Sequence, residues 1–203
     1  MIAVYNEHVG DVLMLILADD KGQKVTAERR ENVTKITAEN GQIVAWNIFE
    51  AKNILSNLTG NGQIELTAEA VEKLNENLKT AGFDELLEFD NQPKFVVAEI
   101  LEMEDIPDTH LHTCQVEVGF DQPVQIVCGA PNAKVGLKTV AALPGAMMPN
   151  GALIFAGSLR GVPSAGMLCA ARELELPNAP QERGIIELSD VSAGQKFEKS
   201  MWK

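Results

Sequence analysis

Short apolar runs separated by glycine and proline fill the second half of this 203-residue chain and constrain its fold more than any other feature. Runs with the character of β-strands are expected at residues 95–103, 113–118, 124–128, 139–143, 153–156 and 166–170. Several short strands with frequent turns are typical of a β-barrel or a β-sandwich. Five-stranded barrels of this size are typical of the OB-fold. The pattern therefore predicts an all-β domain over residues 94–203, a barrel or a sandwich, and an OB-fold barrel is compatible with it.

The first half of the chain has a mixed pattern, and residues 1–90 are predicted to form an α+β domain of unknown role. Strands are expected at 1–5 and 12–18. Residues 33–38 and 42–48 flank Asn40-Gly41, which predicts a β-hairpin with a type I′ turn. Helices are expected at 49–58 and at 68–81, the second capped by Thr67. The polar stretch 90–93 is the expected linker.

The charge of the chain limits the kinds of partner that it can bind. The formal net charge is −12, and both halves are acidic, with 8 basic and 16 acidic residues before position 94. Binding to phosphates normally needs a basic surface, because it neutralises charge and releases counterions. The balance therefore argues against strong non-specific nucleic-acid binding, while a local cationic face remains compatible with it.

The cysteines and the start of the chain predict a cytoplasmic location. Three cysteines, an odd number without a C-x-x-C motif, favour reduced thiols over a disulfide framework. The first eleven residues lack the basic segment that opens a signal peptide. The apolar run Val12–Ala18 is far shorter than the roughly 20 residues that a membrane span requires. No membrane association is expected.

The candidate catalytic and metal motifs are weak. His110, His112 and Cys114 have the period of two that places side chains on one face of a strand, but a fourth zinc ligand is missing. Ser164 is not in a G-x-S-x-G motif, because Val162 occupies the first glycine position. The glycine- and lysine-containing loop 129–139 does not match a phosphate-binding loop. We expect no catalytic residue, no metal and no cofactor, so the chain is not predicted to be an enzyme.

Three motifs in the second half carry a resemblance to a known family. They are the opening residues 95–101 with Pro107-Asp108 and 114–119, the middle segment 125–132, and the late segment 159–174. Together they resemble the EMAP II-like tRNA-binding domain, and the version with Cys-Gly-Ala-Pro-Asn and Arg-Glu-Leu is most similar to the domain near the N-terminus of the bacterial phenylalanyl-tRNA synthetase β subunit. With its N-terminal half included, the chain resembles the stand-alone YtpR-type tRNA-binding proteins.

The resemblance implies an OB-fold that binds tRNA without a catalytic centre. The family's binding loops correspond to Arg160, Ser164 and Met167, with Asn132 in the earlier loop. Arg160 suits phosphate pairing or stacking on a base, and the polar groups of Ser164 and Asn132 suit hydrogen bonds to bases or the 2′-hydroxyl. Met167 is more typical of core packing. The basic residues Lys134, Lys138 and Arg172 complete the predicted RNA-binding set.

Two departures from the family pattern predict weak binding of tRNA or a different ligand. Ser158 and Leu111 stand where the family often has lysine, and each lost phosphate contact lowers the salt dependence of binding by roughly one unit. The alternative hypothesis is therefore a protein-interaction module, with an aminoacyl-tRNA synthetase or a second copy of the chain as its partner.

Overall fold

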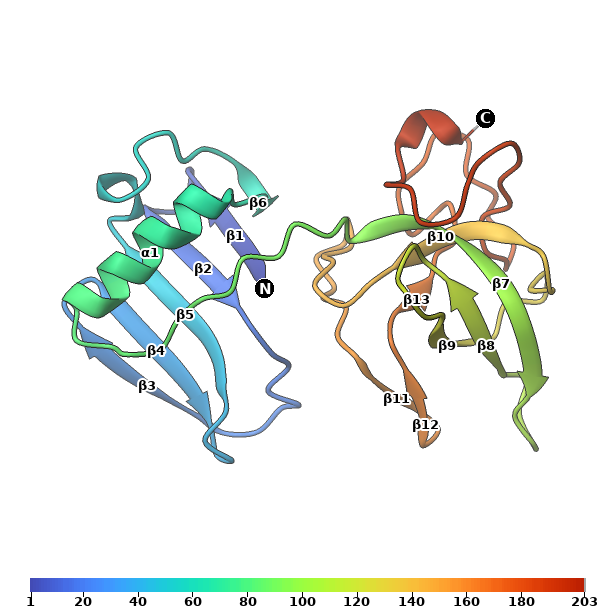
Figure 1. The fold of residues 1–203 in the computed structure, drawn as a ribbon, viewed down its shortest axis with the longest axis horizontal. Helices are drawn as coiled ribbons and strands as arrows, with labels where there is room; N and C mark the ends of the chain where they lie inside the picture. The colour runs from blue at the N-terminus through green and yellow to red at the C-terminus, as the bar shows by residue number, and fades with distance from the viewer. Residues whose placement is uncertain (203) are drawn as a thin grey trace. The chain divides into compact units, whose positions relative to one another are not determined.

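The computed structural model describes residues 1–202, and the chain is divided into two compact units (Figure 1). The first unit runs from Met1 to Gln92, and the second begins at Pro93. Among the described residues, no helix has both the length and the apolar character that crossing a membrane requires.

The first unit is an antiparallel sheet covered on one face by a helix. Its strands are β1 (Ile2–Asn6), β2 (Val12–Ile16), β3 (Val25–Arg30), β4 (Val33–Ala38), β5 (Ile43–Phe49) and β6 (Asn61–Ile64). Their order in the sheet is β3-β4-β5-β2-β1-β6. Helix α1 (Ala68–Thr80) lies across the sheet, as Figure 1 shows. The predicted α+β class of this half is confirmed.

Helix α1 forms where the sequence predicts it. The hydroxyl of Thr67 accepts a hydrogen bond from the backbone N–H of Ala70 at 3.2 Å and caps the first turn. Val71, Leu74 and Leu78 share one face of the helix and are buried in the core of this unit. Burial of this apolar stripe, more than intrinsic helix propensity, holds a helix of 13 residues in place.

The helix predicted over residues 49–58 is wrong. Phe49 is the last residue of β5, and only a short 3₁₀ turn, η1 (Ala51–Asn53), follows it. Glu50 between them has a left-handed backbone, with φ of 54° and ψ of 40°, which a right-handed helix does not accommodate. The backbone N–H of Phe49 donates to the carbonyl of Asn32 at 2.8 Å, so this residue continues the sheet.

The predicted hairpin is confirmed, but its turn is not type I′. Strands β4 and β5 pair antiparallel, and Ala38 and Gln42 face each other through a hydrogen bond from the Ala38 N–H to the Gln42 carbonyl at 2.9 Å. Of the loop residues only Gly41 has a positive φ, 85°. The side chain of Asn40 instead accepts a hydrogen bond from the Gln42 N–H at 2.9 Å. A three-residue loop of this kind replaces the two-residue turn.

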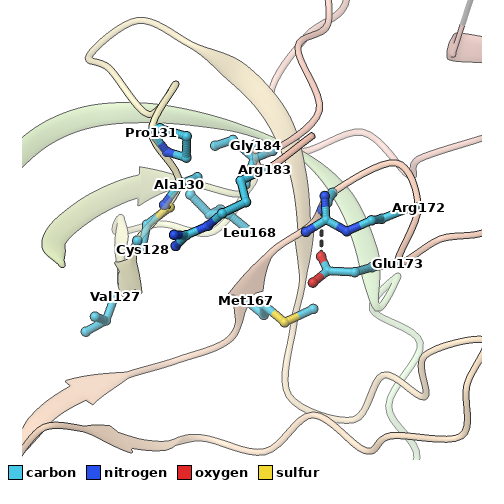
Figure 2. A pocket seen from close by; sticks show the side chains of 13 residues that line it. Val127, Cys128, Ala130, Pro131, Met167, Leu168, Arg172, Glu173, Arg183 and Gly184 are labelled. Carbon is cyan, nitrogen blue, oxygen red and sulfur yellow. Dashed lines mark hydrogen bonds between the residues drawn. The ribbon is translucent and has the colours of Figure 1, made fainter. Parts of the chain in front are cut away.

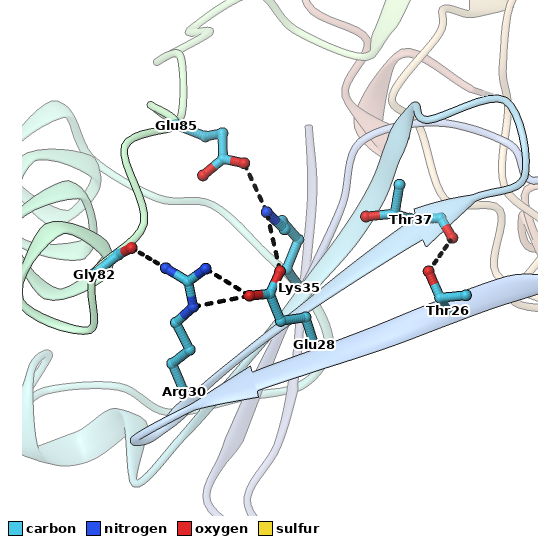
Figure 3. Close-up of polar contacts among 7 residues, drawn as sticks. All are labelled: Thr26, Glu28, Arg30, Lys35, Thr37, Gly82 and Glu85. Atoms are coloured by element: carbon cyan, nitrogen blue, oxygen red, sulfur yellow. Dashed lines mark hydrogen bonds and ion pairs between the residues drawn. The ribbon is translucent and has the colours of Figure 1, made fainter.

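The alternation of apolar and polar residues does not reveal strand β3, because all six of its side chains are exposed. An ion-pair cluster holds it to the rest of the unit (Figure 3). Glu28 accepts from Arg30 at 2.6 Å and lies 3.4 Å from the ammonium group of Lys35. Lys35 also contacts Glu85 at 2.9 Å, and this hydrogen bond lowers the pKa of Glu85. Arg30 in turn donates to the carbonyl of Gly82. The cluster therefore ties β3 and β4 to the segment after α1.

The second unit is a nearly closed barrel of short strands. The five strands of its sheet are β7 (Phe95–Asp105), β8 (His112–Glu117), β9 (Val124–Cys128), β10 (Lys138–Ala142) and β13 (Met167–Leu168), in the order β13-β10-β7-β8-β9. A separate hairpin, β11 (Gly157–Leu159) with β12 (Val162–Ser164), packs against β9. The last described element is a 3₁₀ turn, η2 (Lys199–Met201). The predicted barrel class is confirmed.

One predicted strand of this unit is absent, and one hairpin was not predicted. Residues 153–156 form no strand, and Leu153 takes part only in an isolated bridge with Met147. The hairpin β11–β12 was not expected, since each of its strands has only three residues and Pro163 interrupts one of them.

Three free thiols are buried in the barrel unit: Cys114, Cys128 and Cys169. Burial raises the pKa of Cys114 and of Cys169 from 9.0 to about 12, and it also raises the pKa of Cys128. All three thiols are therefore protonated at neutral pH, and protonated thiols are poor nucleophiles.

Two glycines bring the end of β8 and the C-terminal segment into backbone contact. Gly119 has a φ of 87° and Gly194 a φ of 86°. A Cβ atom on Gly119 would lie 2.6 Å from the Cα of Gly194, and the reverse distance is 2.5 Å. Gly194 donates to the carbonyl of Val97, so the contact fixes the C-terminal segment along β7.

We predict that Gly119→Ala destabilises the barrel by about 1–3 kcal/mol more than Gly136→Ala, because the added methyl group forces two backbones apart. Gly136 is a matched control, since its φ of 81° carries the same left-handed strain but a Cβ there meets no atom within 4 Å. Urea unfolding of the full chain, with hydrogen exchange at barrel amides as the readout, measures the difference. Equal losses in the two variants would contradict the contact.

We also predict that the barrel loses stability as the pH rises from 9 towards 12. A pKa that is higher in the folded state favours folding below the unfolded value of 9.0, and this contribution disappears as the pH approaches the folded value of about 12. Cys169→Ala should make the decline shallower by about 1.4 kcal/mol per pH unit. Val140→Ala, a truncation in the same buried cluster, should lower stability without changing the slope. Parallel curves for wild type and Cys169→Ala would refute the expectation.

Candidate nucleic-acid interface

A pocket of about 200 Å³ opens on the barrel unit where three segments far apart in the sequence meet (Figure 2). The end of β9 and the loop after it form one wall, residues 127–131. Strand β13 and the turn that follows form the second wall and include Met167, Ala170 and Glu173. Residues 183–185 form the third. The middle and late motifs of the sequence therefore converge on one hollow.

Two guanidinium groups and one carboxylate line this pocket. Arg172 donates to the backbone carbonyl of Glu182 at 2.5 Å, which fixes one of its nitrogens. Arg183 has no hydrogen-bond or ion-pair partner among the described residues, and Figure 2 shows its side chain extending over the pocket. Glu173 accepts a hydrogen bond from the N–H of Ala170 at 2.7 Å. The charged side chains of the pocket are thus more basic than acidic, although the unit as a whole is acidic.

Asn132 lies beside the pocket and holds its third wall. Its side-chain oxygen accepts from the N–H of Ile185 at 2.9 Å, and its amide nitrogen donates to the carbonyl of Ile185 and to Glu187, both at 2.9 Å. Gly184 packs against the same carboxamide, where a Cβ atom would lie 3.0 Å from the Asn132 oxygen. These contacts use the polar atoms of Asn132 for structure.

Ser164 closes the barrel. Its hydroxyl accepts from the N–H of Val127 at 3.0 Å and donates to the carbonyl of Gly166 at 3.0 Å. The neighbouring Ala165 N–H donates to the carbonyl of Gln125 at 2.8 Å, so the end of β12 is joined to β9. A hydroxyl that both donates and accepts within the protein has little capacity left for a ligand.

Arg160 is at the tip of the β11–β12 hairpin. Leu159 pairs with Val162, so Arg160 and Gly161 form a two-residue turn, and their φ values of 53° and 82° are those of a type I′ turn. The Arg160 side chain is exposed and makes no hydrogen bond or ion pair with any described residue. The tip therefore presents an unpaired cation to solvent.

The other predicted residues are placed differently. Lys134 is exposed on the loop after β9 and has no partner in the part of the chain that the structure describes. Lys138 donates to the carbonyl of Val191 at 2.8 Å and is partly buried. Met167 is half-buried and lines the pocket with Arg172, whereas Lys134, Lys138 and Arg160 do not line it. The structure thus brings together two of the seven predicted residues in the pocket.

Arg183 is not among the seven residues predicted to bind RNA. It lies in an irregular segment whose proximity to the pocket depends on the hydrogen bonds of Asn132 to Ile185, and no local pattern reveals that contact.

The two histidines of the possible zinc motif make different contacts. His112 lies 2.8 Å from the carboxylate of Asp105, and Cys114 is fully buried between the strands. His110 and Leu111 pack against Gly129, where a Cβ would lie 2.8 Å from the Leu111 side chain. No group of three or more His, Cys, Asp or Glu side chains suited to a metal ion occurs in residues 1–202.

Each unit matches a known family model. Residues 20–90 match a domain of unknown function, and residues 95–196 match the family described as "Putative tRNA binding domain". Over 202 residues, the chain is 43% identical to the "Putative tRNA-binding protein YtpR" of Bacillus subtilis, covering 98% of this chain and all of that protein.

The second unit is also similar to one segment of a larger enzyme. It is 48% identical over 109 residues to the phenylalanine–tRNA ligase beta subunit of Lactococcus lactis and 45% identical over 109 residues to that of Streptococcus pyogenes. Each match covers about half of this chain, 51% and 52%, but only 14% of the enzyme subunit. The similarity therefore belongs to a domain and not to the synthetase as a whole.

Proposed function

The chain belongs to the YtpR-type family, and we propose that its barrel unit, residues 94–203, binds tRNA without catalysing a reaction on it. The proposed contacts are electrostatic and polar, and they read the shape and backbone of the RNA. We place the protein in the cytoplasm, where three free cysteines stay reduced.

The observation that carries this proposal is the set of cations left unpaired on the loops of the barrel. Lys134, Arg160 and Arg183 are exposed, and none has a partner among the described residues. In the first unit, Arg30 and Lys35 belong to the ion-pair cluster, while Lys79 on α1 is exposed. Phosphate oxygens form charge-assisted hydrogen bonds with unpaired guanidinium and ammonium groups.

Binding without chemistry is supported by how the reactive side chains are used. The hydroxyl of Ser164 is occupied in closing the barrel. The thiol pKa values are raised by burial, so the thiols retain their protons at neutral pH. These groups serve the structure of the barrel.

The acidic balance of the chain sets the expected strength of binding. Its formal charge of −12 opposes RNA at long range, so binding should be weak and confined to the cationic loops. Ser158 and Leu111 stand at positions where the family often has lysine, and the missing positive charges should weaken binding further.

We predict that Arg160→Asn lowers tRNA affinity by up to about fivefold, as for one exposed charge pair. It should also reduce the slope of log affinity against log salt by about 0.9, the value for one phosphate contact. Asparagine removes the charge while keeping the turn, because Asn-Gly is favoured in type I′ turns. Fluorescence anisotropy of labelled bulk tRNA over a salt series measures both quantities.

Lys79→Gln is the control for Arg160→Asn, since it removes one exposed cation from α1 in the first unit and should change neither quantity. Equal effects of the two variants would place the binding surface elsewhere. If wild type fails to bind tRNA even at low salt, the proposal is wrong, and a protein partner such as a synthetase becomes the better hypothesis.

A further inference from the structure

The pocket of the barrel unit has the features of a site for one small anionic group attached to a flat apolar one. Arg172 and Arg183 supply the cationic side, while Met167, Ala130 and Pro131 supply apolar surface (Figure 2). Guanidinium groups pair with phosphate oxygens in two-pronged geometry and stack on planar rings. These properties match a nucleotide.

The size of the pocket limits how much of a ligand enters it. Its volume of about 200 Å³ is below the roughly 300–1,000 Å³ of sites that enclose whole drug-sized ligands and cofactors. A single base with its phosphate at the rim fits this space better than a dinucleotide. A base can enter only when it is unstacked, as in loops and single-stranded ends of RNA.

The walls of the pocket are fixed before a ligand arrives. Asn132 makes three hydrogen bonds that hold Ile185 and Glu187, and Arg172 is anchored to the carbonyl of Glu182. Glu173 is held by the N–H of Ala170. Preorganised groups lose little conformational entropy on binding, so even a small pocket can contribute measurably to affinity.

We propose that this pocket receives one unstacked nucleotide of a single-stranded RNA segment, with the phosphate between Arg172 and Arg183 and the base against the apolar surface around Met167. This nucleotide would be one part of a larger RNA contact, so the inference rests on the tRNA binding proposed above. It adds a requirement that backbone contacts alone do not impose, namely an unpaired base.

Variants of the full chain test the two halves of the pocket separately. Arg183→Ala should weaken tRNA binding about tenfold and lower the salt slope by about one unit, because a charge-assisted phosphate contact is lost. Met167→Ala should weaken binding with the salt slope unchanged, because only contact with the base is lost. Arg183→Lys, which keeps the charge, should retain the slope. Lys199→Ala, in η2 outside the pocket, is the control and should change neither quantity.

Amide NMR of the full chain distinguishes failure of the pocket from failure of tRNA binding. A single-stranded RNA tetranucleotide and adenosine 5′-monophosphate should shift the Gly129 and Gly184 amides in wild type and not in Arg183→Ala, whereas a blunt RNA duplex should not shift them. Equal shifts with inorganic phosphate would overturn base binding. If tRNA binds but the pocket variants match wild type and these amides do not move, the pocket proposal is wrong. If the amides move but tRNA does not bind, the proposed function fails and the nucleotide site stands.

Discussion

The closure of the barrel between β9 and β12 is the constraint on which the rest of the second unit depends. One hydroxyl, that of Ser164, bridges Val127 and Gly166. Two residues beyond it, Gly166 passes so close to β10 that a Cβ would lie 2.6 Å from the carbonyl oxygen of Ala142. This close passage lets β13 pair with β10 and sets Met167 and the turn after it opposite the end of β9. The contacts that close the barrel therefore also position the walls of the pocket.

An acidic chain can still carry the local cationic surface that we propose. Charges act over about 8–10 Å in physiological salt, so a local arrangement matters more than the sum over the chain. The barrel unit places exposed cations at turns and loops, with Arg160 at the tip of the β11–β12 hairpin and Arg183 at the pocket. In the first unit, the charged side chains of the ion-pair cluster, Glu28, Arg30, Lys35 and Glu85, pair with one another and hold the exposed edge strand β3. Similar residue types thus hold an edge strand in the first unit and form the proposed RNA contacts in the second.

Periodicity predicted the elements that bury a regular face and missed those that do not. Helix α1 and strands β7 to β10 have apolar side chains at regular intervals, and each was expected within a few residues of its observed bounds. Strand β3 has six exposed side chains, and β11 and β12 have three residues each, so neither period nor length reveals them. Residues 49–58 have a composition that suits a helix, but the left-handed backbone of Glu50 prevents a helix there.

The sequence by itself determined the class of each unit and the order of the barrel motifs, because these depend on local spacing and turn chemistry. Only the tertiary structure decided what the polar signature residues do. Asn132 and Ser164 are the types that bind RNA bases, yet long-range hydrogen bonds to Ile185 and Val127 use their polar atoms inside the protein. Conversely, Arg183 becomes part of the pocket only because those bonds bring a distant segment to it. Hydrogen-bond partners across the fold are not encoded in spacing along the chain, and so the assignment of polar side chains to structure or to ligand required the folded barrel.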